Sequence, residues 1–200
     1  MRWMNLISDL GDSGVLLPLS LILALALWRY QSSRAALYFL SAAGFCLAIV
    51  VSLKLILIAC GAPWGAGIIS PSGHTSMSAT VYGTLGLITA RQAPQWQRPF
   101  IAVATMAFVG CIAFSRIVLG AHSIAEVALG FLVGATAVSL FALQYFRLGA
   151  GKINLLLVGA SFVFVLFLLH GTRLPVEELI RQLASVGRAT LHACPGDQQH

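Results

Sequence analysis

The chain has 200 residues, of which 58% are hydrophobic and 9% are charged, and its formal net charge is +6. A mean hydropathy of +0.90 with so few charges excludes an ordinary water-soluble domain, in which about 25% of residues are charged. The positive residues are scattered along the chain and form no basic patch, so the sequence argues against nucleic acid as a partner.

Six apolar stretches follow one another along the chain, and each approaches the roughly 20 residues that a helix needs to cross a membrane. They predict spans at about 13–30, 35–59, 74–90, 99–115, 122–146 and 153–170. Residues 1–12 precede them and predict a short interfacial segment with Trp3 at headgroup level. Buried helices of a soluble protein are the alternative, but six such stretches would leave too little polar surface for solubility. The sequence therefore predicts an all-α, polytopic membrane protein, a bundle of six transmembrane helices in one domain of residues 1–200.

A further helix is predicted after the last span, at about 174–192. Pro175 stands at its first turn, and two glutamates follow just inside. Apolar residues at 176, 179, 180 and 183 fall on one helical face. This pattern is typical of an amphipathic helix that lies on a membrane surface.

The charged residues divide between the two ends of the predicted bundle. One set of loops carries only basic residues, namely Arg29, Arg34, Arg91, Arg98, Arg147 and Lys152. All the acidic residues fall on the other side, namely Asp9, Asp12, Glu126, Glu177, Glu178 and Asp197. Basic loops mark the cytoplasmic side of a membrane protein. We therefore expect the two termini and the 60–73 and 115–126 segments to face outward, toward the periplasm or a lumen, and the expected location is a bacterial inner membrane with the site on its periplasmic face.

Ionisable residues within or beside the spans gather at this outward end. Lys54 lies near the end of the second span and His74 at the start of the third, while Arg116 ends the fourth span. His122 and Glu126 begin the fifth. An ionisable group inside a span is costly and is by default a functional candidate. The convergence of all five on one face favours a shared site over snorkelling by Lys54 or a core role for His74.

The spacing of His122 and Glu126 indicates a nucleophilic imidazole. The two residues are four apart on a helix, so their side chains share one face. A carboxylate that bonds one ring nitrogen fixes the tautomer and leaves the other nitrogen free to attack.

The remaining residues suit a phosphoryl group. Lys54 and Arg116 supply positive charge, and arginine can hold two oxygens at once. The backbone N–H groups at Ser72 and Gly73 stand ahead of a helix and suit an anion. His74 then remains to protonate a leaving alkoxide.

This set of residues resembles the type-2 phosphatidic acid phosphatase superfamily, which includes lipid phosphate phosphatases and is related to vanadium haloperoxidases. The superfamily carries the motifs K-x6-R-P, P-S-G-H and S-R-x5-H-x3-D. Residues 71–74 match the second motif completely, and residues 115–126 match the third except that Glu126 replaces the usual Asp. Of the first motif only Lys54 is present, because Gly61 stands where the superfamily has Arg.

The resemblance implies that His122 attacks phosphorus to form a phosphohistidine, that Glu126 orients it, and that His74 protonates the leaving group. Phosphate would be bound by Lys54, Ser72, Gly73 and Arg116. Water would hydrolyse the intermediate without a metal or a cofactor. The expected activity is that of a membrane phosphatase acting on a lipid phosphate or pyrophosphate. Undecaprenyl pyrophosphate, phosphatidate, phosphatidylglycerophosphate and lipid A phosphates all remain open as substrates, and the sequence does not indicate the oligomeric state.

Three other functions remain as alternatives. A phosphotransferase could use the same histidine to pass the phosphoryl group to a lipid or sugar hydroxyl. A zinc hydrolase could use His74, His122 and Glu126, although no HExxH-like pair occurs and Arg116 would repel a metal. A non-catalytic lipid carrier or transporter would need polar residues deep in its spans, and the first, fourth and sixth spans have almost none.

Overall fold

A computed structural model describes residues 2–60, 70–149, 151–169 and 171, together with 176, 178–180, 182, 183 and 185. All regular structure among these residues is helical, which confirms the predicted all-α class. The helices are α1 (Arg2–Asp9), α2 (Ser13–Tyr30), α3 (Ser33–Cys60), α4 (Gly73–Gln92), α5 (Arg98–Val118), α6 (Ile124–Tyr145) and α7 (Leu155–Leu169), with a 3-10 turn at Gln95–Gln97. The bounds of α2 to α7 follow the predicted apolar spans closely.

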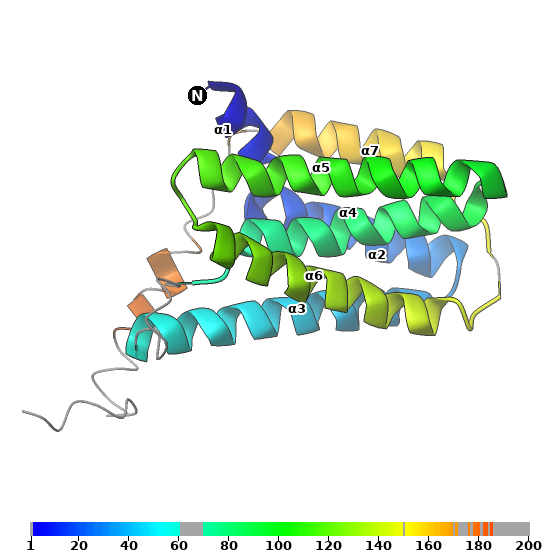
Figure 1. Cartoon of the computed structure of the whole chain (residues 1–200). Coiled ribbons are helices and arrows are strands. Elements are labelled where there is room, and N and C mark those ends of the chain that lie inside the picture. The colour runs from blue at the N-terminus through cyan, green and yellow to red at the C-terminus, as the bar shows by residue number, and fades with distance from the viewer. Residues whose placement is uncertain are drawn as a thin grey trace, which may run out of the picture.

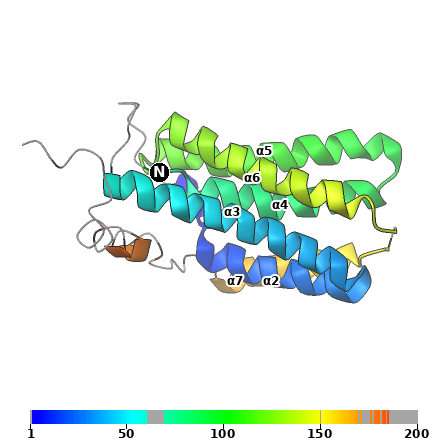
Figure 2. The same ribbon diagram turned by 90° about the horizontal axis from the view of Figure 1, so that it is seen from below.

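The helices α2 to α7 run side by side along one direction, and α1 lies across one end of this bundle (Figures 1 and 2). The helix α4 is at the centre, where it packs against α2, α3, α5 and α6. The helix α7 packs against α2, and α1 packs against α5. Residues 2–9, predicted as an interfacial segment, thus form a helix that contacts the bundle.

The central helix α4 is the most polar of the long helices, and its polar side chains are enclosed by its neighbours. Ser76, Thr80 and Thr84 are fully buried, and the Thr80 hydroxyl donates to the Ser76 carbonyl oxygen at 2.9 Å. Glycines and small hydroxyl residues let membrane helices approach closely. A Cβ atom added to Gly83 would lie 3.0 Å from Val138 of α6. This close packing holds the middle of α4 against α6.

Four segments of the described chain are long and apolar enough to cross a membrane: Arg2–Tyr30, Ser33–Ile58, Gln95–Val118 and Ile124–Tyr145. Large apolar side chains also lie exposed on the outside of the bundle, including Leu21, Phe100 and Phe167. Such apolar surface is typical of contact with lipid. These features indicate a membrane protein. The helix α7 is apolar but shorter, and α4 is not among the four segments, so the count of six spans stays a prediction.

The C-terminal amphipathic helix is described only in part. Residues 176, 178–180, 182, 183 and 185 are helical, and Ile180 is buried. The remainder of 174–192 lies outside the described residues, so a helix on the membrane surface also stays a prediction.

Candidate active site

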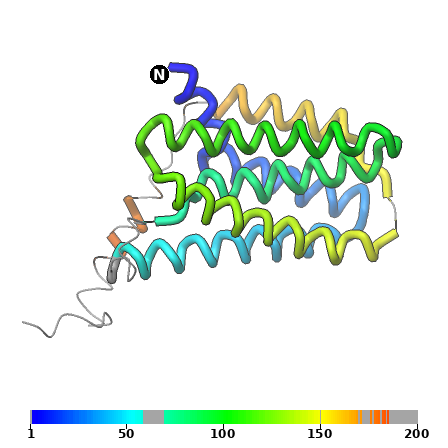
Figure 3. The backbone as a smooth tube through the Cα atoms, viewed as in Figure 1, coloured from blue at the N-terminus to red at the C-terminus, as the bar shows by residue number. Residues whose placement is uncertain are grey.

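The candidate active site lies at the end of the bundle where α2, α4 and α6 begin and where α3 and α5 finish (Figure 3). Each of the three starting helices has a side-chain cap, from Asp12, Ser72 and Ser123 respectively. A capping side chain satisfies a backbone N–H group that has no partner inside its helix. The caps therefore fix three helix ends in the region where the sequence predicts catalysis.

Glu126 holds His122 through the first turn of α6. The turn is a capping box, in which the Ser123 hydroxyl accepts from the Glu126 amide at 3.3 Å and Glu126 Oε2 accepts from the Ser123 amide at 2.9 Å. The same Oε2 lies 3.1 Å from His122 Nδ1. Glu126 Oε1 accepts a hydrogen bond from the Ser70 amide at 2.7 Å. The carboxylate is thus buried and held from three directions, and it engages Nδ1 of His122 while Nε2 lies on the other side of the ring.

A short turn links Arg116 to His122. The His122 amide donates to the Arg116 carbonyl oxygen at 3.3 Å, and the Ala121 amide donates to the same oxygen at 3.0 Å. Gly120 sits in this turn with φ of 65°, a left-handed conformation that glycine adopts without strain. The arginine and the histidine of the third motif are therefore brought together by local backbone structure.

The loop before α4 is fixed to α6. The Ser72 amide donates to the Glu126 carbonyl oxygen at 3.1 Å, and a Cβ atom added to Gly130 of α6 would lie 2.5 Å from the Ser72 carbonyl oxygen. The Ser72 hydroxyl accepts from the Thr75 hydroxyl at 3.0 Å and caps α4. We predicted that the Ser72 amide is available to an anion. In this structure the Ser72 amide is already bonded to the Glu126 carbonyl oxygen, and phosphate binding by Ser72 stays a prediction.

His74 has its own carboxylate partner, which the sequence did not reveal. Its Nε2 lies 3.5 Å from Asp12 Oδ2, and the Asp12 and His74 side chains are 8% and 25% exposed. The other oxygen of Asp12 accepts from the Gly14 amide at 2.8 Å and so caps α2. A Cβ atom added to Gly11 would lie 3.4 Å from His74 Cβ, so the α1–α2 turn rests on His74. Asp12 is one of six acids in the chain, but a pairing across 62 sequence positions leaves no local pattern.

The two cations come from α3 and α5. Lys54 is only 3% exposed, and it lines a cavity of about 120 Å³ together with Asp12, Gly73 and His74. Arg116 donates from one terminal nitrogen to the Ser8 hydroxyl of α1 at 2.7 Å. The charges of Lys54 and Arg116 act on both His74 and His122. The structure therefore brings Lys54, Arg116 and the two histidines into one electrostatic environment.

The pKa of His122 is lower than that of an ordinary histidine. Burial of the ring is the main cause; the hydrogen bond to Glu126 opposes it, and the positive charge of Lys54 lowers the pKa further. Burial disfavours the charged imidazolium. His122 lies in the turn before α6, and its lowered pKa favours the uncharged imidazole, which is the form that can act as a nucleophile.

Among the described residues, no three His, Cys, Asp or Glu side chains gather in a way that could hold a metal ion. Each histidine of the site is instead paired with one carboxylate. Residues 61–63, where the sequence departs from the first motif, lie outside the described part of the chain.

Comparison with known proteins supports the sequence motifs. A family model described as "PAP2 superfamily" matches residues 56–150. An "Uncharacterized 22.5 kDa protein in cps region" of Klebsiella pneumoniae is 33% identical over 196 residues, which cover 92% of this chain and 91% of that protein. No solved structure gives a significant match.

Proposed function

This chain belongs to the PAP2 superfamily, and from that membership we propose that it is a membrane phosphatase acting on a lipid phosphate or pyrophosphate. Members of the superfamily are generally phosphatases, which supports a phosphoric ester hydrolase. The observation that carries the proposal is the His122–Glu126 pair, at 3.1 Å, beside the buried cation of Lys54.

In the first step, Nε2 of His122 attacks phosphorus and forms a P–N bond. The bond between phosphorus and the leaving oxygen breaks, and His74 donates a proton to that oxygen. Glu126 keeps the Nδ1 proton in place and stabilises the positive charge that develops on the ring. In the second step, water attacks the phosphohistidine, His74 accepts the proton of the water, and phosphate leaves as His122 is regenerated.

Phosphate binding is assigned to Lys54, Gly73 and Arg116. Charge supplied by fixed cations can stabilise the equatorial oxygens of a five-coordinate phosphorus. Ser72 contributes by holding the loop, since its amide and hydroxyl are both bonded within the protein. The Asp12 carboxylate lies beside His74 and favours the protonated imidazole. It thereby raises the fraction of His74 that carries the proton to be donated. Asp12 is therefore a positioning residue for the acid.

A lipid substrate fits the location of the site. The cavity beside Lys54 and His74 has apolar walls from α2, α3 and α4, including Leu16, Val50 and Met77. These helices belong to an apolar bundle. An amphiphile can leave its hydrocarbon chain in the bilayer and present its phosphate to the two histidines. A free sugar phosphate would gain nothing from such walls.

Phosphate release by the purified full-length protein tests this proposal. The panel is undecaprenyl pyrophosphate, phosphatidate, phosphatidylglycerophosphate and a lipid A phosphate, each with and without a lipid alcohol as acceptor. We expect free phosphate from at least one lipid, no need for an acceptor, inhibition by vanadate and no loss in EDTA. A product that forms only with acceptor would replace the hydrolase with a phosphotransferase. Inactivation by EDTA that zinc reverses would favour a metal-dependent hydrolase.

The site is proposed to face outward from a bacterial inner membrane. The support is the segregation of charge, because Lys or Arg residues but no acids occupy the loops at the opposite end. A reporter fused after His200 should be active only outside the cytoplasm. A cytoplasmic reporter would overturn either the orientation or the even number of spans.

A further inference from the structure

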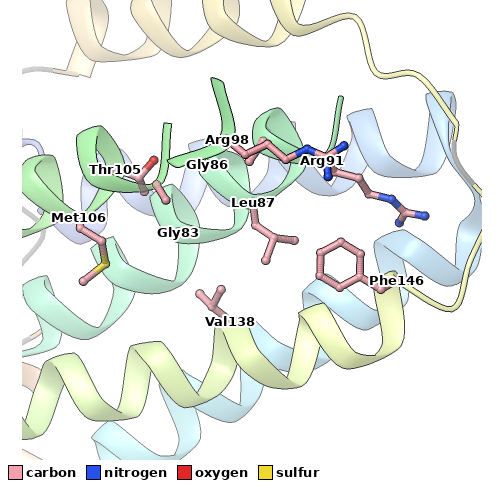
Figure 4. Close-up of a pocket in the computed structure, with 11 residues that line it drawn as sticks. Gly83, Gly86, Leu87, Arg91, Arg98, Thr105, Met106, Val138 and Phe146 are labelled. Atoms are coloured by element: carbon pink, nitrogen blue, oxygen red, sulfur yellow. The ribbon is translucent and has the colours of Figure 1, made fainter. Parts of the chain in front are cut away.

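A second cavity lies far from the two histidines, toward the opposite end of the bundle. It has a volume of about 360 Å³ and is bounded by α4, α5 and α6. Its walls are mainly apolar, with Leu87, Met106 and Val138 among them, and Arg91 and Arg98 also line it. Arg91, Arg98 and Phe146 lie toward one end of the cavity and Met106 toward the other (Figure 4). The volume is within the range of about 300–1,000 Å³ for small-molecule sites.

This cavity continues along α4 as a groove. An adjoining cavity of about 220 Å³ shares Gly83, Thr105, Met106 and Val138 with it and extends to Ala79. From Ala79 to Arg91 the groove is about 18 Å long at about 1.5 Å per helical residue. One leaflet of a bilayer is about 15 Å of hydrocarbon, half of the roughly 30 Å core. The groove therefore has the length of an acyl chain that crosses one leaflet.

The groove opens on the outside of the bundle. Met106 is 54% exposed and Phe146 is 56% exposed, and Ala102 on the groove is exposed as well. Trp96 and Phe100 lie close in sequence to Arg98, and both are largely exposed. Aromatic and basic residues of this kind mark the level of the lipid headgroups. A chain in the groove would thus have its polar end beside the arginines.

The charge at this end is positive throughout. Two of the N–H groups of Arg91 donate to the Tyr145 and Leu148 carbonyl oxygens, at 2.7 and 2.8 Å, which ties the guanidinium to the end of α6. Arg98 donates from Nε to the Ala93 carbonyl oxygen at 3.3 Å and is exposed. No Asp or Glu occurs between residues 13 and 125 or between 127 and 176. A headgroup here meets two cations, and Glu126 at the opposite end is the one acid on the three helices.

We propose that this groove binds an anionic phospholipid, with one acyl chain along α4 and the headgroup phosphate at Arg98 and Arg91. Arg91 contributes a fixed charge, because its position is set by α6. Arg98 contributes a charge that can adjust to the phosphate. The site is separate from the candidate active site and does not depend on the proposed phosphatase activity. It would stabilise the contact of α5 with α6, which meet less extensively than α4 meets either of them.

The test compares phosphatidylglycerol with phosphatidylcholine of identical acyl chains, added to the delipidated full-length protein in detergent. Binding is measured by native mass spectrometry and by the shift of the thermal unfolding midpoint. We expect preferential binding of phosphatidylglycerol. In Arg98→Gln that binding should weaken about fivefold, the effect of one basic residue at a membrane surface. Ala102→Trp fills the groove from an exposed position and should remove binding of both lipids. Arg34→Gln removes a charge from the same end but outside the groove, and is the matched control.

The proposal would be overturned by equal affinity for the two lipids, by unchanged phosphatidylglycerol binding in Arg98→Gln, or by the same loss in Arg34→Gln. Lipid binding that persists in Ala102→Trp would also overturn the proposal. So would the finding that a second copy of the protein covers the groove in place of lipid. Phosphate release from the lipid panel should be unchanged in Arg98→Gln, which separates this test from that of the phosphatase. Monodisperse elution of each variant shows that it is folded.

Discussion

The two histidine–carboxylate pairs of the site are built in different ways. His122 and Glu126 are four residues apart and lie 3.1 Å from each other, and Glu126 belongs to the capping box that begins α6, so their geometry comes almost entirely from local structure. His74 lies in the first turn of α4, whereas Asp12 is the residue that caps α2, and the two side chains lie 3.5 Å apart. The second pair exists only when α1, α2 and α4 are packed together. One half of the proposed chemistry is therefore encoded in local sequence, whereas the other half depends on tertiary packing.

The largest expected effect is from His122→Ala. If His122 is the nucleophile, loss of the imidazole should reduce phosphate release by more than about 10⁴-fold on every substrate. It should also remove any acid-labile phosphoenzyme trapped by rapid quenching. If the variant still formed the phosphoenzyme, the nucleophile would be a different residue. The two histidine–carboxylate pairs would then not divide the roles of nucleophile and acid between them.

His74→Ala should have the next largest effect, and it should depend on the leaving group. General acid catalysis contributes about 10²–10⁴-fold when the leaving group is a poor one such as a lipid alkoxide. An aryl phosphate already has an acidic leaving group, so its turnover should fall by less than about tenfold. Rates for both substrates in the same preparation check this. Equal losses would mean that His74 is not the acid.

Glu126→Gln should reduce turnover by about a hundredfold and shift the pH profile. In the native protein burial holds the pKa of His122 low, and Glu126 opposes that shift. Removal of the carboxylate charge therefore lowers the pKa of His122 further. Activity needs the neutral imidazole and is lost as the pH falls through this pKa, so the acid limb of kcat/KM should move to lower pH. A limb that moves to higher pH would contradict the assignment.

Asp12→Asn should have the smallest effect, about tenfold on a lipid substrate and little on an aryl phosphate. Asparagine caps a helix as well as aspartate does, so the melting temperature should stay unchanged while the charge beside His74 is lost. Asp12→Ala is the comparison, because it also removes the cap and should cost about 1 kcal/mol of stability. A uniform loss on both substrates in Asp12→Asn would leave Asp12 with a structural role alone.

Much of the fold was predictable because it is determined by apolar length. The spans predicted at about 13–30 and 99–115 correspond to α2 at Ser13–Tyr30 and α5 at Arg98–Val118. Hydrophobic stretches and helix caps are local signals, so they can be recognised in the sequence without any knowledge of tertiary contacts. The pairing of His122 with Glu126 was predicted from their spacing of four residues, although His122 lies in the turn before α6 and the Glu126 side chain reaches it from the first turn of the helix.

The parts that were not predictable depend on contacts between distant segments. Arg116 bonds Ser8 across 108 residues, and the Ser72 amide is taken by the Glu126 carbonyl oxygen of α6. Neither contact leaves a periodic pattern in the sequence, because each results from the tertiary packing of loops and helices. The sequence therefore indicated which residues meet at one end of the bundle, but not which of their hydrogen-bonding groups are already in use.

Gly130 touches neither histidine, yet it sets how far apart they can be. Even a methyl group at this position would lie 2.5 Å from the Ser72 carbonyl oxygen, well inside van der Waals contact. Any side chain there would push the first turn of α4, and His74 with it, away from the turn that carries His122. The distance between the nucleophile and the acid therefore depends on the absence of a side chain at residue 130, and only glycine fits at this position.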